Sequence, residues 1–549
     1  MWPEEEVKMA EDLKELAERH EHLAEYINRY VKEGGEMPEY REVLTEELVT
    51  VRRPNIIYPV GDPIFIHVHY DDAKGKFYTA VEPSLTPEER SKLERIKRMI
   101  LEMAPEASDF ETKEEFKEVL EKMLDKVTVL RERRGLFPVF NEKRVPVTLR
   151  EKRRILYALH RDLVEMGPLE PVIRDPYLED IHVVGLKPVA VVHKIFGLVP
   201  TNIRFTDEGE LDRYVRTLGE RIGKPVTETK PIIDGALPEG SRVNIIYGEE
   251  VSKEGTSFTI RKFFEKPPTM PQLVRWGTFS AEMAAYLWLC LEHGMSVFVC
   301  GETASGKTTS LNAMLSFIDF HKKVYSAEDT PEVVAPQPVW QRLVTRETIF
   351  EEAKVELFDL VKTALRSRPD YVIIGEIRGK EGAAAFQAMQ TGHAVLSTFH
   401  ASSVSKMIQR FTGDPINVPV RFIDNMNVAI FQRIVYKGGR LLRRVATVDE
   451  IIRYSKEKGG ILTRSVFRWD PVTDKHYFTG MYNSYILEGK IAPMMGLTNP
   501  KDIYKELRKR ARIIRNMAER GIVGYDEVNR IFRDYYERGF DGIPEELLY

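Results

Sequence analysis

Nine consecutive residues have the composition of a loop that binds phosphate. They contain the pattern G-x-x-x-x-G-K-[ST]. The glycines would let the backbone bend around phosphate, Lys307 could reach the β- and γ-phosphates, and the Thr308 hydroxyl could bind Mg²⁺. An apolar run precedes the loop and a helix is expected after it, as the motif requires. We therefore predict an ATP- and Mg²⁺-binding P-loop formed by Gly301, Glu302, Thr303, Ala304, Ser305, Gly306, Lys307, Thr308 and Thr309.

Glu376 is a second candidate, because it follows the apolar run 371–374. Ligands bind at the carboxyl ends of strands in open α/β sheets. Glu376 could therefore serve the metal ion, its water shell or the attacking water. A usual Walker B strand has Asp directly before this Glu, whereas here that place is Gly375. The alternative is an ordinary solvated carboxylate at the end of a strand.

Two further groups lie before and after Glu376. Glu328 and Asp329 follow an expected strand and could orient or deprotonate water, although an acidic turn would look the same. His393 and His400 bracket the expected strand 394–399. Seven residues apart on a strand, they would lie on opposite faces, which argues against one shared metal ion. Taken alone, each is an ordinary histidine.

The elements that must position these residues divide the chain into sections. Section 1–145 is expected to be a helical and β extension, with one helix over 4–33 and helix starts at Thr86 and Thr112. Section 146–265 reads as an α/β domain, and the proline-rich segment 266–277 reads as a linker. Section 278–549 alternates strands and helices, which is typical of a mostly parallel sheet buried on both faces. Its expected strands are 296–300, 324–326, 371–374 and 394–399.

Composition narrows the function further. The 549 residues carry a net charge of −4, whereas nucleic-acid binders tend to be strongly basic. No apolar run reaches the ~20 residues of a membrane span. The two cysteines read as buried, reduced thiols of a cytoplasmic protein. One basic cluster could contact nucleic acid or lipid, but a solvated helix or a docking face explains it better; it comprises Lys505, Arg508, Lys509, Arg510, Arg512 and Arg515.

Together, the P-loop, the Glu328–Asp329 pair, Gly375–Glu376 and the two histidines resemble the secretion ATPase superfamily of type II secretion, type IV pili and type IV secretion. Within it the chain resembles the archaeal branch, and most closely the ATPase of the archaellum, the archaeal flagellum. The telling stretches are 368–371, 385–393 and 406–419. The likeness covers about residues 145–450 strongly. One departure is Thr330, where many relatives have Pro directly after the Asp.

This resemblance implies roles that spacing alone does not. It implies a ring-forming homo-hexamer with a RecA-like C-terminal P-loop domain and an N-terminal α/β domain that closes over the nucleotide. Arg242 and Arg261 match the arginines that such a domain brings to the phosphates. Glu328 resembles the carboxylate that activates water and Glu376 the one on the metal side, although the two could be exchanged. His393 and His400 match phosphate-sensing residues.

We therefore expect a cytoplasmic Mg-ATPase held at the membrane by partners. The resemblance implies a polytopic membrane platform protein and accessory cytoplasmic archaellum proteins as partners, and no nucleic acid. The function of this ATPase would be to power assembly of the archaellum filament, and it could also power rotation of the filament. The alternatives are an archaeal pilus-assembly or secretion ATPase, a nucleic-acid translocase, and a scaffold that binds ATP with little turnover.

Overall fold

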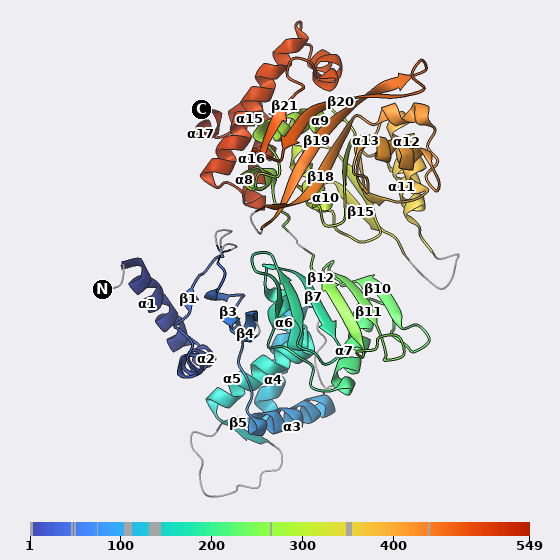
Figure 1. The fold of residues 1–549 in the computed structure, drawn as a ribbon. Coiled ribbons are helices and arrows are strands. Elements are labelled where there is room, and N and C mark those ends of the chain that lie inside the picture. The colour runs from blue at the N-terminus through green and yellow to red at the C-terminus, as the bar shows by residue number, and fades with distance from the viewer. Residues whose placement is uncertain are drawn as a thin grey trace, which may run out of the picture. The chain divides into compact units, whose positions relative to one another are not determined.

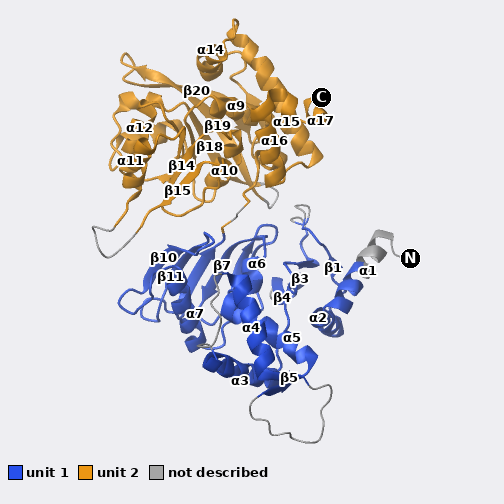
Figure 2. Cartoon of the chain, turned by 180° about the vertical axis from the view of Figure 1, so that it is seen from behind, with its two compact units in different colours: residues 1–262 blue, residues 263–549 orange. Residues whose placement is uncertain are grey.

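The computed structural model describes residues 4–44, 48, 51–73, 75–103, 112–130, 144–263, 266–346, 354–437 and 440–549. The chain forms two compact units, unit 1 over residues 1–262 and unit 2 over residues 263–549 (Figure 2). Each unit has its own sheets and its own buried clusters. None of the helices that the structure describes has the length and apolar character needed to cross a bilayer.

Unit 1 begins with two helices where the sequence predicted one. Helix α1 ends at Arg19 and α2 begins at Glu21, because His20 between them is extended (φ −118°, ψ 90°). The His20 ring packs edge-on against Phe65, 5.1 Å between centroids. The helix starts predicted at Thr86 and Thr112 are confirmed, each with a capping box, and the structure shows a third capping box at Thr148. The helices of unit 1 are α1 (Glu4–Arg19), α2 (Glu21–Lys32), α3 (Pro87–Met103), α4 (Lys113–Val127), α5 (Leu149–Leu159), α6 (Glu170–Arg174) and α7 (Glu208–Arg221).

Two main sheets complete unit 1 (Figure 1). The first has the order β1-β2-β3-β4, and the second is antiparallel with the order β10-β11-β12-β7-β8-β9. The strands are β1 (Glu39–Tyr40), β2 (Asn55–Pro59), β3 (Phe65–Asp71), β4 (Gly75–Val81), β7 (Leu178–Val184), β8 (Ala190–His193), β9 (Gly197–Pro200), β10 (Ile232–Ala236), β11 (Arg242–Ile246) and β12 (Ser257–Arg261); β5 (Thr128–Leu130) and β6 (Val145–Val147) form a short pair.

The front section of unit 1 shares its core with the section that follows. One buried cluster joins Ile56 and Tyr78 to Val183 and Ile260. A second joins α3 and α4 to α5. The packing therefore crosses the expected division at residue 145, and the division between compact units falls at 262/263.

Unit 2 contains a nine-stranded sheet of order β15-β14-β16-β17-β13-β18-β19-β20-β21. Pairing is parallel from β15 to β18 and antiparallel beyond, so the predicted α/β fold with a mostly parallel sheet is confirmed. The strands are β13 (Val297–Gly301), β14 (Val324–Glu328), β15 (Trp340–Val344), β16 (Tyr371–Ile377), β17 (Ala394–Phe399), β18 (Val428–Lys437), β19 (Arg440–Ser455), β20 (Gly460–Asp470) and β21 (Lys475–Phe478).

Helices cover both faces of this sheet (Figure 1). One face packs against α9, α10 and α15, and the other against α11, α12 and α13. The helices of unit 2 are α8 (Met270–Arg275), α9 (Ala281–Glu292), α10 (Lys307–Met314), α11 (Leu357–Ser367), α12 (Glu381–Gln390), α13 (Val404–Thr412), α14 (Ala492–Met494), α15 (Ile503–Arg520), α16 (Tyr525–Arg538) and α17 (Glu545–Leu548).

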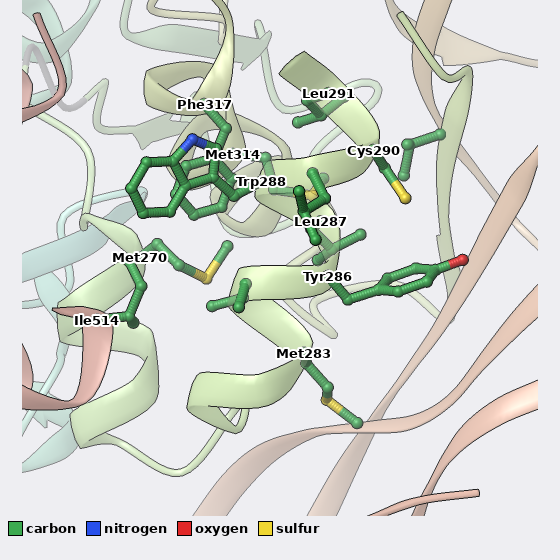
Figure 3. Packing of buried hydrophobic residues seen from close by; sticks show 14 of the residues in the cluster. Met270, Met283, Tyr286, Leu287, Trp288, Cys290, Leu291, Met314, Phe317 and Ile514 are labelled. Carbon is green, nitrogen blue, oxygen red and sulfur yellow. The ribbon is translucent and has the colours of Figure 1, made fainter. Parts of the chain in front are cut away.

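Helix α9 is the centre of the unit 2 core, and Trp288 on it stacks on Phe317 (Figure 3). Met270 of α8 lies in the same cluster, so the segment expected to be a linker is partly helical and packed. The basic helix α15 also packs on α9. Its Arg510 is buried, forms an ion pair with Glu292 and lies 4.6 Å from the centre of the Trp288 ring.

Candidate functional site

The predicted phosphate-binding loop lies between β13 and α10, the strand–loop–helix context that its motif needs. Its backbone bends through Ala304 (φ 61°) and Gly306 (φ 91°), which caps α10. At Gly301, a Cβ atom would lie 2.5 Å from Ser305 Oγ and 2.6 Å from the Gln432 carbonyl oxygen. Only glycine therefore fits at Gly301, and the αL dihedrals favour glycine at Gly306.

Lys307 lies across this loop. Its Nζ donates to the Glu302 carbonyl at 3.0 Å and lies 3.5 Å from His400 Nε2. Burial lowers the pKa of Lys307, while the negative charge of Glu376 acts in the opposite direction. Thr308 and Thr309 follow in the first turn of α10, whose free amide groups suit an anion.

Glu376 and His400 lie at the carboxyl edge of the sheet, beside the loop. Strands β13, β16 and β17 are parallel neighbours, so their carboxyl ends meet at one edge. A bulge between Ile374 and Glu376 shifts the register there. Glu376 Oε1 lies 2.7 Å from His400 Nε2, and the other oxygen forms an ion pair with Arg378. The P-loop lysine, the carboxylate and the histidine thus form one connected group.

Glu328 ends β14, the other neighbour of β16, and its side chain is buried. Its Oε1 accepts hydrogen bonds from the backbone amides of Glu332, at 2.8 Å, and Val333, at 2.7 Å. Its Oε2 is buried without a hydrogen-bond partner. Burial raises the pKa of Glu328 to about 7, although the two amides and Arg342 lower it. A carboxyl with this pKa can gain or lose a proton near neutral pH.

The structure gives a reason for Gly375 in place of the expected aspartate. A Cβ atom at Gly375 would lie 3.2 Å from Glu328 Cγ, which is tighter than an ordinary contact. The Glu328 side chain therefore occupies the space beside Gly375. The loop after Pro331 turns the amides of Glu332 and Val333 back onto Glu328.

The structure does not bring His393 to this group. His393 precedes β17, at the amino edge of the sheet, and bonds Thr391 Oγ1 at 3.1 Å. His400 follows the same strand, at the carboxyl edge. The two histidines are seven residues apart along β17, about 23 Å at ~3.3 Å per residue. The structure therefore places only His400 beside the loop, and the phosphate-sensing role of the two histidines stays a prediction.

Arg242 and Arg261 lie in unit 1 and face one another across strands. They form a direct cross-strand pair of β11 and β12, and both lie on the exposed face of the sheet. Arg242 contacts Asp234 at 2.7 Å, and Arg261 lies 3.9 Å from Asp180. The structure thus brings the two candidate arginine fingers together, each beside an aspartate.

Sequence analysis missed several residues next to the loop. Arg443 Nε of β19 donates to the Ala304 carbonyl at 3.0 Å, and Gln432 Oε1 of β18 accepts from Ser310 at 3.0 Å. Both come from a distant hairpin, and no local pattern marks them. A cleft of about 240 Å³ opens beside the loop, lined by Gly301, Glu302, His400, Ala401, Ser402, Lys406 and Arg410.

Two groups beside the loop suit an Mg²⁺ ion that is bound together with a nucleotide. Over the described ranges, no three His, Cys, Asp or Glu side chains are grouped so as to hold a metal. Mg²⁺ in nucleotide sites is usually held by one or two protein groups together with phosphates. Thr308 in α10 and Glu376 at the strand end suit that arrangement.

Comparison with known proteins assigns a family to much of the chain. The family model described as "Type II/IV secretion system protein" matches residues 162–459. An uncharacterized protein of Methanocaldococcus jannaschii is 54% identical over 540 residues, 97% of this chain and 98% of that protein. The type IV secretion system protein VirB11 of Bartonella quintana is 24% identical over 284 residues, 46% of this chain and 80% of that protein. A crystal structure of the pilus retraction motor PilT with ADP covers 51% of this chain and 81% of its own, at 21% identity and a TM-score of 0.38.

Proposed function

Because the chain belongs to the type II/IV secretion system protein family, we propose that it is an ATPase that drives a secretion or filament machinery. One observation carries the proposal. Lys307 of the phosphate-binding loop lies 3.5 Å from His400, which lies 2.7 Å from Glu376. A phosphate-binding cation and a strand-end carboxylate thus lie at one edge of the sheet, as nucleotide hydrolysis requires.

Each residue has a defined task in this proposal. The loop amides and Lys307 bind the phosphates, and Lys307 exchanges its bond to the Glu302 carbonyl for a phosphate oxygen. Thr308 and Glu376 would hold Mg²⁺, which neutralises phosphate charge when bound. Glu328 accepts the proton of the attacking water. Arg242 and Arg261 supply charge to the transferred phosphoryl group.

The machinery that we propose is the archaellum, with archaeal pilus assembly or secretion as the alternatives. The stretches 368–371, 385–393 and 406–419 support this choice by their resemblance to the archaellum ATPase. The proposal includes a homo-hexamer at the cytoplasmic side of a membrane platform protein, together with accessory archaellum proteins. Reconstitution tests it: the platform protein in polar-lipid vesicles should raise turnover.

A nucleic-acid translocase is a weaker alternative. The basic helix α15 was the feature that suggested it, yet its cations have partners within unit 2. Arg510 pairs with Glu292, Arg515 with Glu282 and Lys505 with Asp502. Turnover should therefore not respond to added DNA, and stimulation by DNA would favour the translocase.

Loss of the Lys307 ammonium tests the nucleotide site directly. Lys307→Ala should bring phosphate release from Mg-ATP to background, because it removes a charged phosphate contact. Lys322→Ala is the matched control, since Lys322 is a half-exposed cation that pairs with Asp370. Near-normal turnover of the Lys307 variant, with the same thermal unfolding midpoint as the control, would reject the site.

A further inference from the structure

An arginine lies beside the unpaired oxygen of Glu328. Arg342 is on β15, the edge strand paired with β14, and its register partner is Ser326. Trp340, two residues before it, donates to Ser326 Oγ at 2.9 Å, so these side chains share one face with Glu328. Arg342 Nε lies 3.8 Å from Glu328 Oε2. That distance is beyond a hydrogen bond, which needs roughly 3 Å.

Two aromatic rings hold the guanidinium near Glu328. Its Cζ lies 5.2 Å from the centre of the Trp340 ring and 5.5 Å from that of Phe263, within the range of cation–π attraction. Trp340 is fixed by its bond to Ser326. Phe263 is different, because it is the first residue of unit 2 and follows Arg261 by two residues. Its ring is the second aromatic surface against the Arg342 guanidinium.

We propose that Arg342 is a positioning residue that controls the ionisation of Glu328, and that the rings of Trp340 and Phe263 hold its guanidinium in place for this role. The inference rests on the proposed role of Glu328 in hydrolysis. A shift of less than about 1 Å would bring Arg342 within hydrogen-bond distance of Oε2. A charged donor there favours the carboxylate, the form that can accept a proton from water.

Few groups near Glu328 affect its ionisation. Glu332 on the following loop is the charge that acts against ionisation, while the amides of Glu332 and Val333 favour it. Strand β16 presents the uncharged Gly375. Arg342 is the cation that lowers the pKa of Glu328. When the arginine moves away, desolvation favours the protonated acid, and the base is lost.

Single-turnover hydrolysis as a function of pH tests the proposal. Arg342→Gln should move the acid limb of the rate to higher pH by about half a unit to one unit, because a nearby cation lowers a carboxyl pKa by roughly one unit or more. The rate at pH 9 should then approach the wild-type rate. Arg342→Lys should restore part of the shift, and Gln341→Ala, on the exposed neighbouring position, should leave the limb in place.

Phe263→Leu should move the acid limb of the pH–rate profile in the same direction. When Phe263→Leu is combined with Arg342→Gln, the limb should shift no further. If the shift in the double variant equals the sum of the two single shifts, the Phe263 ring does not act through Arg342. A rate that falls equally at every pH in Arg342→Gln would overturn the positioning role.

Infrared difference spectra provide a readout that does not need turnover. Comparison with Glu328→Gln identifies the protonated carboxyl band of Glu328 in the nucleotide-free protein. At pH 7, Arg342→Gln should increase this band, and an unchanged band would overturn the inference. If the wild-type protein does not hydrolyse ATP, the proposed function fails, and the infrared titration still decides the effect of Arg342 on Glu328.

Discussion

His400 Nε2 lies 2.7 Å from Oε1 of Glu376, joining the end of β17 to the end of β16. Burial and the charge of Lys307 lower the pKa of His400, while the negative charge of Glu376 acts in the opposite direction. The ring thus lies directly against the carboxylate and restricts where Glu376 can point.

Loss of this contact should slow hydrolysis. His400→Ala should lower turnover by roughly 10- to 100-fold, the usual effect of removing a group that orients a carboxylate or ligand. His393→Ala is the comparison, because His393 lies at the opposite edge of the sheet. Its turnover should stay near wild type in steady-state phosphate release. Equal losses in the two variants would contradict the arrangement described here.

Replacement of the buried Glu328 carboxyl should affect the rate of hydrolysis but not the binding of ATP. Glu328→Gln should bind ATP normally but lower the single-turnover rate by roughly 10²–10⁴-fold, the range for a lost general base. In the wild-type protein the rate should fall as pH decreases through about 7, because the protonated form of Glu328 cannot accept a proton. Isothermal titration and rapid quench measure the two quantities. A full single-turnover rate would remove Glu328 from the reaction.

The same carboxyl should make stability depend on pH. Its folded pKa of about 7 lies above the ordinary 4.5. The proton therefore stabilises the fold fully below pH 4.5, and this contribution is lost as pH rises through 7. The loss at pH 8 is at most about 3.5 kcal/mol, from ~1.4 kcal/mol per pKa unit. Glu328→Gln has no proton to lose.

The difference in unfolding free energy between Glu328→Gln and the wild-type protein should therefore shift in favour of the variant between pH 5 and pH 8. Denaturant unfolding of the nucleotide-free protein at four pH values measures this. Glu457→Gln, on an exposed turn, serves as the control. A constant difference across the pH range would show that Glu328 does not titrate near 7.

Arg242 and Arg261 test the proposed contribution of unit 1. Arg261→Lys or Arg242→Lys should leave the ATP dissociation constant nearly unchanged and lower turnover at least roughly tenfold, a floor under the 10³–10⁵ range of arginine fingers. Lysine keeps the charge but cannot present two fixed donors. Arg53→Lys, an exposed substitution elsewhere in unit 1, is the control. Wild-type turnover in both finger variants would mean that unit 1 does not complete the site.

Local patterns predicted much of this molecule. The P-loop, the strands that carry Glu328 and Glu376, and the capping boxes depend on residues close in sequence, so spacing was sufficient to find them. Contacts between distant segments were not predictable. Gln432 and Arg443 approach the loop from the β18–β19 hairpin. Arg510 pairs with Glu292, which lies 218 residues before it in the sequence.

The expected linker shows why composition can mislead. Its prolines suggested irregular backbone, because each removes an amide donor. Pro271, however, lies in the first turn of α8, where that donor has no helical partner to lose. The undivided helix over 4–33 was wrong as well, since the backbone is extended at His20, whose ring packs edge-on against Phe65.

The facing positions of Arg242 and Arg261 restrict how this chain can change in length. The segment 247–256 joins β11 to β12 outside their paired register, so residues inserted there would leave the arginine pair intact. One residue inserted within either strand would turn its arginine toward the buried face, because side chains alternate. Descendants of this sequence can therefore lengthen the exposed part of this loop, residues 249–251, and keep the pair, whereas an insertion within either strand would separate it.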